Sequence, residues 1–167
     1  MALSSSNRSD AAAANRLAAL FRAHGWNVDA EPGGERRQPD LVISKGPEHY
    51  VVEIKSAWEG RPDRVLPLLS QAILEVRRYA EFSAMRPLAV VQVNHASPSL
   101  HQKVEQFQRD YAPDVAIGLV SDAGASQFIG GPGLEALNVE VSRSAGRDKS
   151  VQPRKASDLF SDLNQWM

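Results

Sequence analysis

Two carboxylates and a lysine occur in this chain at a spacing that could support chemistry. The segment QPDLVISKGPEHYVVEIKSA contains Asp40, Glu53 and Lys55 around a Gly46-Pro47 turn signal. Glycine supplies the positive φ that a tight hairpin turn needs. With Gly46 and Pro47 as the turn residues, Asp40 lies opposite Glu53. Lys55 then shares the face of Glu53, because side chains alternate along a strand. The pattern predicts a hairpin with three charged groups at one end.

These three side chains favour metal-assisted hydrolysis of a phosphodiester bond. Two carboxylates directly opposite on a sheet repel each other. Mg²⁺ removes that repulsion, since it prefers oxygen ligands and takes only one or two carboxylates, leaving other positions to water and phosphate. Lys55 adds a charge that can orient a water or stabilise a transition state. The alternative is a solvated Glu-x-Lys pair, because short motifs often match by chance.

The apolar side chains of the predicted hairpin divide between its two faces. Val42 and Val51 share the face of the charged groups, nearer the turn. The other face is predicted to consist of Leu41, Ile43, Tyr50, Val52 and Ile54. These apolar surroundings, together with the predicted register, favour a catalytic group over a chance match of the motif.

The Asp and Glu-x-Lys pattern of Asp40, Glu53 and Lys55 resembles the PD-(D/E)xK nuclease superfamily, which has the restriction-endonuclease-like fold. The resemblance implies an α/β fold with an αβββαβ core, whose central mixed sheet is flanked by helices. It also implies a deoxyribonuclease that depends on Mg²⁺ (or Mn²⁺), with DNA as its partner. Asp40 and Glu53 would be the metal ligands, and Lys55 would assist the attacking water. Gln71 looks like the Gln that many relatives place on the helix after the lysine strand, pointing at the metal site.

The order of predicted elements agrees with that core over about residues 10–94. The expected elements are a helix from Ser9 or Asp10 to about His24, a strand over 26–30, the hairpin, a helix over 65–85 and a strand over 87–94. The second helix tolerates Pro67 only in its first turn. Its apolar residues Leu69, Ile73, Val76 and Ala80 recur at helical spacing.

A C-terminal helix and β-hairpin extension is expected beyond residue 94. Ser97 and Pro98 are a favourable helix start, followed by an apolar stripe of Leu100, Val104, Phe107 and Tyr111. Further on we expect a hairpin of 115–120 with 127–129 and a last strand through Leu137, Val139 and Val141. The predicted organisation is a disordered start over 1–9, a nuclease domain over 10–142, a basic loop over 143–155 and an amphipathic helix over 156–167.

Basic residues cluster on both sides of the proposed metal site. Arg36 and Arg37 precede Asp40, and Arg61 and Arg64 follow Lys55. Arginines contact phosphates without reading sequence, so these four are predicted to bind the DNA backbone. The net charge of −1 gives no separate argument for nucleic acid.

Composition indicates a single domain. The chain has 167 residues, of which 43% are hydrophobic, and it can bury a real core. It has no cysteine, which excludes thiolate metal sites and is compatible with a cytoplasmic location. No apolar run approaches membrane-spanning length. The apolar helix over 157–167 could mediate a homodimer or lead into a further domain.

One departure from the superfamily pattern leaves a second interpretation open. Many relatives carry a Glu on the first helix, but that region here reads AAAANR, with Asn15 as the nearest polar candidate and Glu31 as a distant substitute. A catalytically degenerate nuclease fold that binds DNA or regulates other proteins is therefore the alternative. An unrelated scaffold that assembles through its terminal helix is a third.

Overall fold

The αβββαβ order predicted for residues 10–94 is present in the structure. The computed structural model describes residues 5–30 and 38–140. Its elements are α1 (Ser5–Ala23), β1 (Asn27–Asp29), β2 (Leu41–Lys45), β3 (Glu48–Ala57), α2 (Pro62–Glu81), β4 (Arg86–Val93), α3 (Pro98–Tyr111), β5 (Ala116–Ser121), β6 (Ser126–Ile129) and a 3-10 turn, η1 (Glu135–Leu137).

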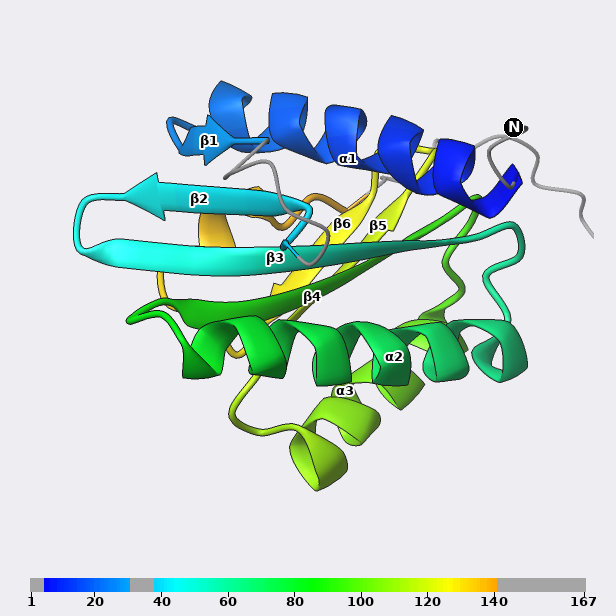
Figure 1. Cartoon of the computed structure of the whole chain (residues 1–167). Helices are drawn as coiled ribbons and strands as arrows, with labels where there is room; N and C mark the ends of the chain where they lie inside the picture. The colour runs from blue at the N-terminus through cyan, green and yellow to red at the C-terminus, as the bar shows by residue number, and fades with distance from the viewer. Residues whose placement is uncertain (1–4, 31–37, 141–167) are drawn as a thin grey trace, which may run out of the picture.

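One mixed sheet organises the described part of the chain. Its six strands lie in chain order, β1 to β6. Strands β1, β2 and β3 are antiparallel neighbours, β3, β4 and β5 run parallel, and β6 returns antiparallel to β5. Helix α1 covers one side of the sheet, while α2 and α3 cover the other (Figure 1). The predicted fold, a central mixed sheet flanked by helices, is confirmed.

The predicted faces of the β2–β3 hairpin are confirmed by the two cores on either side of the sheet. The face towards α1 packs Leu41, Ile43, Tyr50, Val52 and Ile54 into one cluster with side chains of that helix. Val51 belongs to the other cluster, under α2, and Val42 packs against its edge. The alternation of the strand therefore sends Glu53 and Lys55 towards α2 and Ser56 towards α1.

The hairpin register is the one that the Gly46-Pro47 turn predicts. Lys45 pairs with Glu48 and Leu41 pairs with Val52. Gly46 has a φ of +57°, the left-handed conformation that glycine adopts without strain. Asp40 stands one position beyond Leu41, so the register directs it to Glu53.

Three element ends meet at one edge of the molecule. The start of α1, the end of β3 and the start of α2 lie together on the right of Figure 1, while the shorter β2 begins at Leu41, opposite Val52 in the middle of β3. Because β3 and β4 run parallel, this edge also carries their carboxyl ends. Ligands of open α/β sheets bind outside the carboxyl ends of the strands.

Two predicted helix starts are wrong. Helix α1 begins at Ser5, not at Ser9 or Asp10, so residues 5–9 are helical. The side chain of Asp10 caps no helix end, because it accepts a hydrogen bond from the backbone of β3 instead. Helix α2 begins at Pro62, a residue suited to a first helical turn, which places Pro67 inside the helix.

Three apolar residues after residue 94 are also not where the pattern placed them. Tyr111 is 69% exposed, although it continues the α3 stripe. Leu137 lies in the 3-10 turn, where its N–H bonds to the carbonyl of Leu134, and Val139 forms only an isolated bridge with Ser126. The predicted last strand is therefore wrong, because local turn hydrogen bonds replace a ladder up to Asn138.

Several predictions lie outside the described residues. They concern the basic loop over 143–155, the helix over 156–167, Val141, and the loop that carries Glu31, Arg36 and Arg37. The predicted domain boundaries stay predictions. Within 5–30 and 38–140, no helix is long and apolar enough to cross a membrane.

Candidate active site

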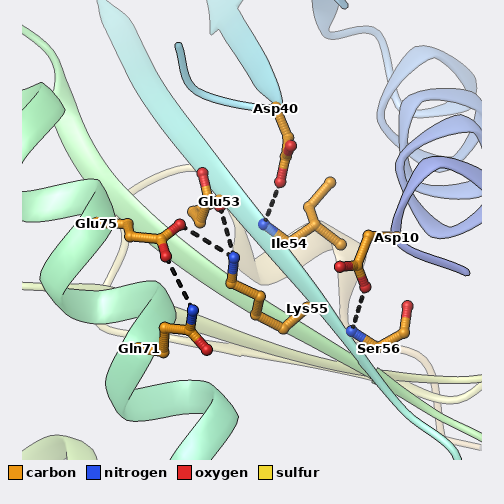
Figure 2. A network of polar contacts seen from close by, with 8 residues as sticks. All are labelled: Asp10, Asp40, Glu53, Ile54, Lys55, Ser56, Gln71 and Glu75. Carbon is orange, nitrogen blue, oxygen red and sulfur yellow. Dashed lines mark hydrogen bonds and ion pairs between the residues drawn. The ribbon is translucent and has the colours of Figure 1, made fainter. Parts of the chain in front are cut away.

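Asp40 is tied to strand β3 across the hairpin. Its Oδ2 accepts a hydrogen bond of 2.8 Å from the backbone N–H of Ile54, the residue between Glu53 and Lys55 (Figure 2). The hairpin register and this bond bring the predicted acidic pair together. The charge of Asp40 is accordingly among the causes that raise the pKa of Glu53.

Lys55 connects strand β3 to helix α2. Its Nζ lies 3.0 Å from Glu53 Oε1 and 3.0 Å from Glu75 Oε2. The Lys55 side chain is only 15% exposed, so these pairs are shielded from much of the solvent. Gln71, one helical turn before Glu75, donates to Glu75 Oε1 at 3.2 Å. Figure 2 shows the resulting chain of contacts from α2 to β3.

Glu53 has an unused oxygen in a buried place. The residue is 5% exposed, and its Oε2 has no hydrogen-bond partner among the residues that the structure describes. Burial raises the pKa of Glu53 to about 9, helped by Glu75 and Asp40 and opposed by Lys55. A buried carboxylate is costly unless it is paired or neutralised. A proton or a cation at Oε2 would remove that cost.

Glu53 and burial shift the pKa values of the neighbouring ionisable side chains. The neighbouring Glu53 carboxyl, which keeps the proton of the pair, lowers the pKa of Glu75, and Lys55 lowers it further. Burial raises the pKa of Asp40, against the hydrogen bond from Ile54. Burial alone would lower the pKa of Lys55, but its bonds to Glu53 and Glu75 raise it, so the amine is charged. Asp40, Glu53 and Glu75 thus form an acidic cluster around the Lys55 ammonium group.

A hard divalent cation fits the donors present. The orphaned Oε2 of Glu53 and the nearby carboxylate of Asp40 are oxygen ligands of the kind that Mg²⁺ prefers. Within the described ranges, no group of three or more His, Cys, Asp or Glu side chains could hold an ion by itself. An ion at this pair would therefore complete its shell with water and phosphate oxygens.

Sequence reasoning missed Asp10, an acid that α1 places at the same edge. Asp10 Oδ1 accepts a hydrogen bond of 3.0 Å from the backbone N–H of Ser56 (Figure 2). Its charge is one of the causes that raise the pKa of Asp40. The candidate that the sequence offered instead, Asn15, is exposed on α1. The first helix thus does bring a carboxylate to the site, five residues before Asn15.

Sequence reasoning also left Glu75 out of the site. The only signal was its spacing of four from Gln71, which places both side chains on one helix face. Gln71 itself is exposed, and its printed contact is with Glu75 rather than with Asp40 or Glu53. Gln71 therefore lies one contact farther from the proposed metal than the resemblance implies.

Two of the four predicted DNA-binding arginines can be placed. Arg61 and Arg64 are exposed at the start of α2, on the same edge as the acidic cluster. Arg61 pairs with Asp63 at 3.1 Å and with Glu59 at 3.9 Å. Exposed pairs of this kind contribute little stability, so Arg61 can exchange them for phosphate.

A known protein family and a solved structure are similar to this chain. The family model described as archaeal Holliday junction resolvase (Hjc) matches residues 5–120. A search of curated proteins finds no match. Among solved structures, Archaeoglobus fulgidus Hjc, a Holliday junction resolvase from an archaeal hyperthermophile, aligns with a TM-score of 0.39 and 12% identity. The alignment covers 79% of this chain and 96% of that one.

Proposed function

We propose that this chain, which belongs to the archaeal Holliday junction resolvase (Hjc) family, cuts four-way DNA junctions at the cluster around Lys55. Family membership makes it a metal-dependent DNA nuclease of the PD-(D/E)xK superfamily. One observation carries the proposal. The matched residues, 5–120, include every side chain of the acidic cluster, and that cluster holds a buried carboxylate oxygen that has no hydrogen-bond partner within residues 5–30 and 38–140.

Asp40 and Glu53 are proposed to hold the divalent ion, which we assign as Mg²⁺ because both donors are carboxylate oxygens. When bound, such an ion lowers the pKa of a coordinated water and offsets charge on the phosphate. Asp40 uses one oxygen to accept from Ile54, which leaves the other for the ion. The free Oε2 of Glu53 is the second ligand.

Lys55 is proposed to orient the attacking water or the scissile phosphate. Its ammonium carries three donors, of which two are used by Glu53 and Glu75. The third can donate to an oxygen of water or substrate. Glu75 positions Lys55, and Gln71 in turn positions Glu75. Asp10 adds a carboxylate from the α1 side of the same edge.

Arg61 and Arg64 are proposed to contact phosphates next to the scissile one. Both lie in the first turn of α2 or just before it, where the helix dipole also favours an anion. Arg36 and Arg37 are proposed for the same task on the other side of Asp40. A cytoplasmic location stays a prediction, which the absence of cysteine supports.

Two copies of the chain are proposed to act on each junction. Separating a four-way junction into two duplexes requires two incisions in different strands. The described residues contain a single Asp40–Glu53 pair, which serves one incision at a time. A homodimer would supply both sites.

Cleavage of a synthetic four-way junction tests the proposal. With Mg²⁺, we expect paired cuts near the branch point, no cuts in EDTA, and little cleavage of a linear duplex of the same sequence. Lys55→Ala should lower the cleavage rate roughly 10²–10⁴-fold, the usual contribution of a positioned acid–base or electrostatic group, while junction binding persists. If the wild type binds DNA but cuts no duplex, single-stranded or branched substrate, the degenerate DNA-binding module is the better account.

A further inference from the structure

We infer that Trp58 is a base-stacking residue, which holds an exposed base-pair face at the branch point of the DNA next to the cleavage site. The inference rests on the proposed junction substrate. It assigns a role to a side chain that the metal site does not use.

Trp58 is the most exposed large apolar side chain of the described residues, at 87%. The other tryptophan within those ranges, Trp26, is 3% exposed and packs edge-on against Phe21 and Tyr50. Single exposed apolar residues are common, so exposure alone assigns no role. The position of Trp58 provides the rest of the argument.

Trp58 directly follows β3, three residues after Lys55. At the rise of an extended strand, three residues span about 10 Å, roughly the length of three stacked bases. Arg61 and Arg64 follow within the next six residues. Along the chain, Trp58 therefore lies between the proposed catalytic lysine and the proposed phosphate contacts, directly after the carboxyl end of β3.

The loop that carries Trp58 is held against its neighbour. A Cβ at Gly60 would lie 1.7 Å from the carbonyl oxygen of His95, so the β3–α2 loop and the loop after β4 touch backbone to backbone. On the N-terminal side of Trp58, Ala57 pairs with Val93 in the β3–β4 ladder, and on the C-terminal side the carbonyl of Arg61 accepts from Arg64 and Val65 as α2 begins. Trp58 thus projects from a loop anchored at both ends, which reduces the ordering cost of binding.

An indole face in this position suits a nucleobase. Stacking on an aromatic side chain is tolerant of sequence, because every base has a π-face. In a continuous duplex those faces are covered by the neighbouring base pairs. At a four-way branch point the stack is interrupted, so base-pair faces become available. Trp58 would distinguish a junction from a duplex without reading its sequence.

Binding measurements on the full chain in EDTA, which prevents cleavage, test this inference. The probes are a labelled four-way junction and a linear duplex of equal length. Trp58→Ala should weaken junction binding about tenfold, within the range measured for loss of one base–aromatic stack. Duplex binding should not change, and the salt dependence of junction binding should keep its slope, because no phosphate contact is lost. Trp58→Phe, which retains an aromatic face, should recover most of the affinity.

Phe82→Ala is the matched control. Phe82 is 85% exposed, but it caps the opposite end of α2, about 30 Å from the start of that 20-residue helix. Its loss should leave binding to both probes unchanged. A 2-aminopurine base at the branch point should be quenched by the wild type and not by Trp58→Ala.

The binding results that would overturn the stacking role differ from those that would also overturn the proposed substrate. If the wild type prefers the junction and Trp58→Ala binds it equally well, the stacking role is wrong and the proposed function stands. An equal loss on junction and duplex, or the same loss with Phe82→Ala, also overturns the stacking role. If the wild type shows no preference for the junction, the proposed substrate and the inference built on it both fail.

Discussion

The Lys55 ammonium on strand β3 lies 3.0 Å from the Glu75 carboxylate on helix α2. Glu53, on the other side of the same ammonium, is also at 3.0 Å. The lysine is therefore fixed between a strand and a helix before any substrate arrives. Pre-organised donors lose little in reorganisation when a transition state forms. Glu75 lies outside the sequence motif, but it helps to hold the Lys55 ammonium in place.

Changing Glu75 should reduce turnover without reducing DNA binding. Glu75→Gln keeps the shape of the side chain but removes the charge that holds Lys55, and misplacement of a catalytic group by an ångström can cost up to about 10²-fold in rate. We expect kcat to fall roughly ten- to a hundredfold with KM nearly unchanged, measured as single-turnover cleavage at saturating protein. Glu75→Asp should recover part of the loss.

Glu81→Gln is the control for Glu75, because Glu81 is exposed at the end of the same helix. It should cleave at the wild-type rate. Unchanged kcat in Glu75→Gln, or a loss that appears only in KM, would show that Glu75 does not position the lysine.

The stability of the ion-free protein should fall as the pH rises from about 4.5 to about 9. In that window folded Glu53 keeps its proton, since its pKa is raised to about 9, whereas the unfolded chain, with the ordinary value of 4.5, has released it. The unfolded state then binds fewer protons, so raising the pH favours unfolding by up to about 1.4 kcal/mol per pH unit. Thermal unfolding in EDTA across this range measures the slope.

Glu53→Gln provides the comparison for that slope. The amide cannot titrate, so the variant should lose most of the decline in melting temperature above pH 5. Saturating Mg²⁺ should have a similar effect on the wild type, because a bound ion holds the carboxylate in its charged form. A wild-type slope that persists unchanged in Glu53→Gln would assign the titration to another group.

The two ends of α2 should differ in their contribution to DNA affinity. Arg64 lies in the first turn, beside the proposed site, and Arg78 lies in the last, about 21 Å further along the helix. If Arg64 contacts a phosphate, Arg64→Ala should make the slope of log affinity against log salt shallower by about 0.9 on duplex arms. Arg78→Ala should leave it unchanged. A larger effect of Arg78 would mean that DNA crosses the opposite end of the helix.

The sequence predicted the hairpin well because its signals are local. A Gly46-Pro47 turn fixes the register, and the two-residue period of a strand then decides which side chains share a face. The same reasoning could not find Asp10 or Glu75, since both reach the site only after helices pack on the sheet. Asp10 was also difficult to place because the polar residues before it show no helical periodicity, although α1 already begins at Ser5.

The errors near Leu137 have a similar cause. Alternating apolar residues at 137 and 139 match a strand, but Leu137 closes a turn on Leu134 and only Val139 reaches β6. Periodicity detects which side chains seek burial, while the choice between a turn and a ladder depends on partners distant in sequence. The PD-(D/E)xK superfamily, by contrast, could be predicted, because its motif lies within one hairpin.

A crystal soaked in Mn²⁺, with anomalous diffraction data, tests the central claim most directly. Mn²⁺ accepts the same oxygen ligands as Mg²⁺ and can be located by its anomalous signal. The account predicts one ion between Asp40 and Glu53, bound by the Oε2 of Glu53, for which the described part of the chain offers no hydrogen-bond partner, with Lys55 outside the coordination shell of the ion. An empty Asp40–Glu53 pair in crystals of a protein that cleaves DNA with Mn²⁺, or an ion held elsewhere without either carboxylate, would contradict it.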